Sequence, residues 1–191
     1  MWTAIIGTIG FGCYLLYDNN SFRWHNRLFS FGFGAGSLLV AAATCIGLAD
    51  AVKSGMIHGL PDLIWLLLAI LSFAALIYCL FFALPFSDTY TKQESEPKLC
   101  DRGVYALCRH PGFIPFFFLY LFLGLAALPG SLLAVGMLFS FWNLLYIWFQ
   151  DRVTFPRSFR EYEDYRQRVP FLIPTPHSTR QAIKTGKKDS A

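Results

Sequence analysis

Five long apolar segments, separated by polar stretches, constrain this chain more than any other feature. A membrane-spanning helix needs about 20 apolar residues, within a range of roughly 17–25. The segments that reach or nearly reach this length are Trp2–Tyr17, Leu28–Ala49, Leu63–Leu84, Gly112–Leu128 and Leu132–Phe149. The sequence therefore predicts an all-α, polytopic membrane protein with about five transmembrane helices.

The composition excludes an ordinary soluble domain. Only 15% of the residues are charged, whereas about a quarter is usual for soluble proteins. The first apolar segment is interpreted as a span and not as a cleavable signal, because no basic region precedes it and no clear small-residue cleavage site follows it.

The distribution of Lys and Arg predicts the orientation of the chain. Five spans place the polar segments Asp18–Arg27, Phe86–Pro111 and Gln150–Ala191 on one side, and these hold 2, 4 and 9 of the 16 Lys and Arg residues. The opposite side holds only Lys53. By the positive-inside rule, the N-terminus is outside and the C-terminus is cytoplasmic. Basic residues beside spans indicate contact with anionic lipid, and not with nucleic acid.

The last forty residues divide into two parts. Aromatic and charged residues alternate at helical spacing in Gln150–Pro174, which predicts an interfacial helix lying on the membrane surface. The polar composition from Thr175 onward predicts disorder. The predicted organisation is thus three spans and a cytoplasmic loop in 1–111, a helical hairpin with its cofactor-site segment in 112–174, and a tail in 175–191.

A basic segment directly precedes the fourth apolar segment and carries Arg109, His110 and Pro111. Pro111 fits the first position of a helix, where a missing N–H costs nothing. The free N–H groups of the first turn, beside Arg109 and His110, would form a site for an anionic group such as a carboxylate. The alternative is a basic anchor that only positions the helix end at the lipid headgroups.

Further polar residues follow the fifth segment, on the same face because the last two segments form a hairpin. Gln150 and Asp151 would accept hydrogen bonds from an amine or a hydroxyl; alternatively, Asp151 and Arg152 only cap a helix end. Tyr162 and Tyr165 offer aromatic faces that attract a cationic sulfonium. The alternative for these rings is an aromatic belt at the membrane interface.

The order of these residues resembles the isoprenylcysteine carboxyl methyltransferase and phospholipid methyltransferase superfamily of integral membrane enzymes. One motif is Gly103-x-Tyr105-x-x-x-Arg109-His110-Pro111. After a hydrophobic hairpin, the other is Tyr162-x-x-Tyr165-x-x-x-Val169-Pro170-x-x-Ile173-Pro174. The resemblance covers the terminal part of the membrane domain, and the first three apolar segments carry no signature of the family.

Several positions depart from the family pattern. Phe113 stands where the family usually has Tyr, and Pro115 stands where it usually has Gly. Two adjacent glutamates usually follow the last span, and aligning the tail tyrosines puts Gln150 and Asp151 there. Ser158-Phe159 replaces a Phe-Gly pair.

The resemblance implies that the chain uses S-adenosylmethionine to methylate a lipid-like or small amphipathic acceptor, which enters sideways between helices. The implied cofactor-binding residues are Tyr105, Arg109, His110, Pro111, Phe113, Gln150, Asp151 and Tyr162. Gln150 and Asp151 are also the implied catalytic residues, because they would hold polar groups of the cofactor or orient the acceptor. Asp151 is expected to lie closest to the reacting atoms.

Other classes of function are compatible with parts of this pattern. A non-enzymatic relative that binds a lipid or a partner would explain the changed motif positions. An NADPH-dependent sterol-type reductase resembles the same terminal architecture but uses a greater set of spans. A transporter is disfavoured because no charged residue lies well inside a span. The sequence contains no close grouping of His and Cys, so a metal site is not predicted. It predicts neither the methyl acceptor nor the oligomeric state.

Overall fold

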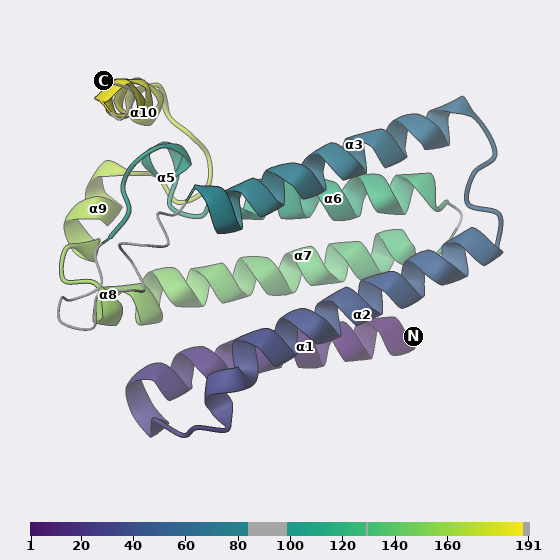
Figure 1. Cartoon of the computed structure of the whole chain (residues 1–191), viewed down its shortest axis with the longest axis horizontal. Coiled ribbons are helices and arrows are strands. Elements are labelled where there is room, and N and C mark those ends of the chain that lie inside the picture. The colour runs from purple at the N-terminus through teal and green to yellow at the C-terminus, as the bar shows by residue number, and fades with distance from the viewer. Residues whose placement is uncertain (84–98, 129, 189–191) are drawn as a thin grey trace.

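The computed structural model describes residues 1–83, 99–128 and 130–188, and every regular element within these ranges is a helix. The long helices of the described residues run along the long axis of the molecule (Figure 1). They are α1 (Trp2–Asn19), α2 (Gly32–Lys53), α3 (Leu60–Ile77), α6 (Phe113–Ala126) and α7 (Leu132–Phe149). Each coincides with one of the five apolar segments, and the all-α fold class is confirmed for the described residues.

Among the described residues, three helical stretches are long and apolar enough to cross a membrane. They are Phe29–Lys53, Leu60–Phe82 and Leu132–Ser158. Helix α6 is apolar but has only 14 residues, and α1 is not among the three. Exposed apolar side chains such as Leu38 on α2 and Ile70 on α3 suit a lipid environment, because soluble monomers rarely expose large apolar patches. The structure thus supports a membrane protein, and crossing by all five helices stays a prediction.

Glycines let the long helices approach each other closely. A Cβ atom added to Gly36 on α2 would lie 2.6 Å from the carbonyl oxygen of Gly10 on α1. One added to Gly124 on α6 would lie 2.5 Å from the Cα atom of Leu133 on α7. Small residues at such crossings are the usual means of packing helices in lipid, where apolar surface alone gives little drive for association. Gly36 therefore allows α2 to pack closely against α1, and Gly124 does the same for α6 and α7.

Short π-helical segments continue three of the long helices. These are η1 (Asn20–Trp24) after α1, η3 (Tyr78–Phe82) after α3 and η4 (Gln150–Thr154) after α7. Such turns are rare in proteins overall, and those that occur are often found at functional sites. They lie at the end of the molecule that also holds α5 (Val104–Leu107), α8 (Phe155–Ser158) and α9 (Tyr162–Arg168), as Figure 1 shows.

The described polar segments gather at this one end, whereas the N-terminus, the α2–α3 connection and the α6–α7 turn lie at the other (Figure 1). The predicted asymmetry of Lys and Arg requires the basic polar segments to lie on one side, and the described ones do. Lys92 and Lys98 of the Phe86–Pro111 segment lie outside the described residues. Which end faces the cytoplasm stays a prediction from the positive-inside rule.

The tail differs from the sequence-based expectation in two ways. Residues 150–174 form η4, α8 and α9 in succession, and not one helix. Tyr162, Tyr165 and Val169 are buried together, so these rings pack inside the protein and do not form an interfacial belt. Where disorder was expected, α10 (Pro176–Lys188) forms and packs against α5. Thr175 starts this helix, because its hydroxyl accepts the N–H of Ser178 at 3.2 Å.

Candidate functional site

The two motifs that carry the family resemblance meet in space. The N–H of Arg109 donates to the carbonyl of Pro170 at 2.9 Å, and that of His110 donates to the carbonyl of Phe171 at 3.3 Å. The Tyr165 hydroxyl donates to the Tyr105 carbonyl at 2.6 Å. Segments some sixty positions apart are therefore held side by side at the entry to α6.

The centre of this junction is a buried ion pair. Asp151, on η4, is only 2% exposed. Its two carboxylate oxygens accept the Nε and Nη2 hydrogens of Arg109 at 2.7 and 3.1 Å. This is the bidentate geometry in which Arg recognises a carboxylate most strongly. Arg109 and Asp151 are therefore close together, as predicted, but in the structure they bind each other.

Arg109 and Tyr162 make further hydrogen bonds around this pair. Nη1 of Arg109 donates to the carbonyls of Arg166 and Val169, at 3.0 and 2.6 Å. The Tyr162 hydroxyl donates to Oδ1 of Asp151 at 2.6 Å. Burial and the adjacent carboxylate raise the pKa of Tyr162, so that it stays a protonated donor. We call Arg109, His110, Asp151 and Tyr162 the Asp151 cluster.

His110 is the member of the Asp151 cluster with unused hydrogen-bonding capacity. Its ring stacks on Phe155 and meets Phe171 edge-on, with centroids 5.7 and 5.1 Å away. The side chain is buried, yet its Nε2 atom has no hydrogen-bond partner among the described residues. Oδ1 of Asp151 lies 3.6 Å away, beyond hydrogen-bond distance. Burial lowers the pKa of His110, against the opposing effect of Asp151, and this favours a neutral imidazole.

Gln150 faces a different set of partners. Its side-chain amide donates to the hydroxyl of Tyr146 at 2.8 Å. That hydroxyl and the hydroxyl of Thr154 donate to the two carboxylate oxygens of Asp18, at 3.3 and 3.1 Å. Asp18, at the end of α1, is 3% exposed. The adjacent residues Gln150 and Asp151 are therefore divided between two networks and do not form one acceptor pair.

We call Asp18, Tyr146, Gln150 and Thr154 the Asp18 network. The sequence interpretation missed Asp18, Tyr146 and Thr154. The available signal was Asp18 itself, an acidic residue at the boundary of an apolar segment, where a buried carboxylate requires hydrogen-bond donors. Nothing in the sequence paired it with residues more than a hundred positions later.

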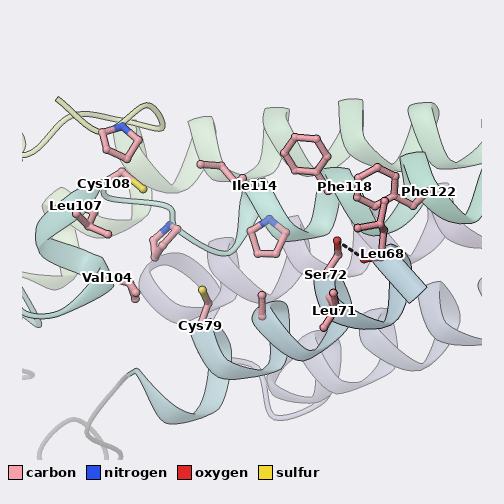
Figure 2. Close-up of a pocket in the computed structure, with 14 residues that line it drawn as sticks. Leu68, Leu71, Ser72, Cys79, Val104, Leu107, Cys108, Ile114, Phe118 and Phe122 are labelled. Carbon is pink, nitrogen blue, oxygen red and sulfur yellow. Dashed lines mark hydrogen bonds between the residues drawn. The ribbon is translucent and has the colours of Figure 1, made fainter. Parts of the chain in front are cut away.

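An apolar cavity of about 510 Å³ lies between α3 and α6, beside the Arg109–Pro111 segment. Figure 2 shows Leu107 and Cys108 at one end of this cavity, and Phe118 and Phe122 further along it. We call it the α3–α6 cavity. Its other lining residues include Ser72, Ala75 and Cys79 on the α3 side and Pro111, Ile114 and Pro115 on the α6 side.

Two of the predicted cofactor-binding residues, Tyr105 and Phe113, do not line the α3–α6 cavity. The Tyr105 hydroxyl instead donates to the carbonyl of Cys79 at 3.0 Å, which ties α5 to η3. Phe113 stacks on Phe117 one helical turn further along α6. Pro111 and Pro115 do line the cavity. Pro115, one of the departures from the family pattern, thus forms part of an apolar wall.

The fit of these residues to S-adenosylmethionine is partial. Its carboxylate requires a donor set, but Arg109 is engaged by Asp151 and two carbonyls. At the start of α6, the Phe113 N–H donates to the carbonyl of His110, and Pro115 has no N–H. Among the predicted side chains, His110 has a buried nitrogen, Nε2, without a hydrogen-bond partner in the described part of the chain. Among the described residues, no three His, Cys, Asp or Glu side chains are grouped as metal ligands.

No protein-family model, no curated protein and no solved structure matches this chain. The geometry of the described residues is therefore what supports a functional assignment.

Proposed function

We propose that this chain is a five-span membrane methyltransferase that uses S-adenosylmethionine and acts on a lipid-like acceptor. Its N-terminus would be outside and its C-terminal region cytoplasmic. The observation that carries the proposal is the junction of the two motifs, at which the N–H groups of Arg109 and His110 donate to the carbonyls of Pro170 and Phe171. Residues that resemble one catalytic family in sequence order thus form one structural unit beside an apolar cavity.

The α3–α6 cavity supports a lipid-like acceptor. Ligand pockets are usually 300–1,000 Å³ and mostly apolar, and this cavity has about 510 Å³ with Leu, Phe, Ile, Val and Pro side chains in its wall. Ala75 and Leu71 line it and are exposed on α3, so an apolar chain would enter sideways from the lipid. The head group would then lie at the Cys108–Pro111 end.

The protein's contribution to methyl transfer would be positioning. S-adenosylmethionine supplies an electrophilic methyl group on a sulfonium, and the transfer needs no covalent enzyme intermediate. Holding two reactants in line contributes about 7–11 kcal/mol in favourable cases. The buried Nε2 atom of His110, which has no hydrogen-bond partner among the described residues, would bind a polar group of the cofactor. The Asp151 cluster would keep the two motif segments in register.

A second candidate is a non-catalytic relative that binds a lipid in the same cavity. The observation in its favour is the bidentate pair of Arg109 with Asp151. Because these side chains satisfy each other, they would leave a cofactor without its predicted ionic partners. A reductase that uses NADPH is the third class compatible with the resemblance.

Calorimetric titration of the purified protein in detergent distinguishes these classes. We expect S-adenosylmethionine and S-adenosylhomocysteine to bind, and NADPH not to bind. The variant His110→Ala should weaken binding of both, whereas His25→Ala, an exposed histidine in the α1–α2 turn, should not. Binding of NADPH alone would indicate a reductase, and lipid binding without S-adenosylhomocysteine binding would indicate the non-catalytic relative.

A matched pair of variants on α3 tests the acceptor site. Ala75 lines the α3–α6 cavity, whereas its neighbour Ala74 is exposed and does not. Ala75→Trp should abolish methylation of lipid extracts, measured with a labelled methyl donor, and should leave binding of S-adenosylhomocysteine intact. Ala74→Trp should retain both. Equal methylation by the two variants would exclude the cavity as the acceptor site.

A further inference from the structure

A second hollow lies at the same end of the molecule and is lined by two arginines. It has about 510 Å³ and is bordered by Asn19, Phe22, Arg23, Val153 and Arg157. The first three come from the end of α1 and from η1, and the other two come from η4 and α8. The proposed methyl transfer does not use any of these residues.

The arginines of this hollow carry positive charge that the described side chains do not neutralise. The ion pairs of the described residues involve Arg109, Arg166 and Arg168, but neither Arg23 nor Arg157. The guanidinium carbon of Arg157 lies 4.8 Å from the centre of the Phe22 ring. A cation over an aromatic face is attracted to it, so this contact fixes one wall of the hollow while leaving the N–H donors of Arg157 available.

The nearest acidic side chain along α1 is turned away from the hollow. Asp18 directs both carboxylate oxygens inward, to the hydroxyls of Tyr146 and Thr154. It is 3% exposed, whereas Arg23 and Arg157 are exposed. The described residues that line the hollow therefore present two guanidinium groups and no carboxylate.

The backbone around the hollow is unusual on both sides. The segment η1 contributes Phe22 and Arg23, the segment η4 contributes Val153, and both are π-helical. Two rare π turns, from opposite ends of the sequence, thus border one hollow. Because π turns are frequent at functional sites, their meeting here is an independent indication that this region binds a ligand.

We propose that this hollow, the Arg23–Arg157 site, binds a phosphate monoester. Arg is the side chain best suited to phosphate, because its planar donors match two phosphate oxygens at once. The volume of about 510 Å³ lies within the usual range of ligand pockets and leaves room for a phosphate. In the predicted orientation the site faces the cytoplasmic headgroup layer, where anionic lipids are found. The phosphate comes either from a lipid headgroup or from solution.

The test uses the full-length protein in neutral detergent and short-chain phosphatidic acid as the probe. We expect binding by calorimetry, and affinity lower by about tenfold or more in R23Q/R157Q, as is typical when charge-assisted hydrogen bonds are lost. The matched control is R152Q/R180Q, which removes two exposed arginines outside the hollow and should bind as the wild type does.

Competition with inorganic phosphate separates the two sources. Displacement of phosphatidic acid by millimolar phosphate indicates a ligand from solution, and displacement only by phosphorylated lipids indicates a headgroup; both outcomes support the site. Absence of binding, or equal losses in the two double variants, overturns it. If R23Q/R157Q aggregates, R23K/R157K replaces it. This variant keeps the charge but should bind phosphatidic acid more weakly, because Lys lacks the planar pair of donors that matches phosphate. Failure of methyl transfer would leave this result unaffected.

Discussion

Two buried carboxylates at the same end of the molecule, Asp18 and Asp151, have opposite kinds of partner. Both are about equally buried, at 3% and 2% exposed. Asp151 faces the guanidinium of Arg109, whereas Asp18 accepts hydrogen bonds from the neutral hydroxyls of Tyr146 and Thr154 and forms no ion pair with a described residue. Burying a charge is costly unless it is paired, so the two sites should respond differently to substitution.

The difference originates in one short segment. The π-helical segment η4 directs Gln150 toward the Asp18 network and Asp151 into the Asp151 cluster. Successive side chains on a helix point in different directions, so adjacent residues commonly serve different neighbours. The Asp151 cluster holds the two motif segments together. The Asp18 network contains no cation, so we expect it to tolerate substitution better than the Asp151 cluster.

Removal of Arg109 should have the largest effect. The variant Arg109→Ala leaves Asp151 buried without its counter-ion, and breaking such a pair costs about 3–5 kcal/mol. Thermal unfolding in detergent measures the loss. The control is Arg168→Ala, whose ion pair with Asp101, at 3.7 Å, is half-exposed and should contribute about 0–1 kcal/mol. Equal stability of the two variants would show that Asp151 needs no cation, and the comparison with Asp18 would fail.

Loss of the hydrogen bond that the Tyr162 hydroxyl donates to Asp151 should have the next largest effect. Tyr162→Phe removes a hydrogen bond to a charged acceptor, which contributes about 1.5–3 kcal/mol. Tyr165→Phe is the matched control, because it removes a hydroxyl of similar burial that bonds a neutral carbonyl and contributes about 1 kcal/mol. Chemical unfolding of both variants under one condition gives the difference. The reverse order would mean that Asp151 is not the charged centre of its cluster.

The Asp18 network should tolerate loss of its charge. Asp18→Asn keeps an oxygen acceptor of the same shape and removes a buried charge that has no cation beside it, so we expect a cost of about 1 kcal/mol or less. Asp151→Asn should cost several times more, because Arg109 would then lack its anion. Measured side by side, similar costs for the two variants would contradict the contrast between the sites.

The sequence predicted the helices well because membrane spans are determined by length and apolar content. It also brought Arg109, Asp151 and Tyr162 to one end of the hairpin. It could not tell whether these residues face a ligand or each other, because an ion pair and a ligand site use the same side chains. Asp18 was missed because its partners Tyr146 and Thr154 are defined by how α1 packs beside α7. Tyr105 does not line the α3–α6 cavity, because its hydroxyl reaches the carbonyl of Cys79, and its role in cofactor binding stays a prediction.

The pH response of His110 should give the smallest effect. Because burial lowers its pKa in the folded protein, the unfolded chain binds the proton more readily. Stability contributed by His110 is therefore complete above its unfolded pKa of about 6.5 and decreases as the pH falls through that value. The slope from this group cannot exceed about 1.4 kcal/mol per pH unit. Melting temperatures between pH 7.5 and 5.5 should fall less in His110→Phe than in the wild type. His177→Phe, at an exposed position on α10, should keep the wild-type slope. A wild-type slope in His110→Phe would instead assign the pH response to another group.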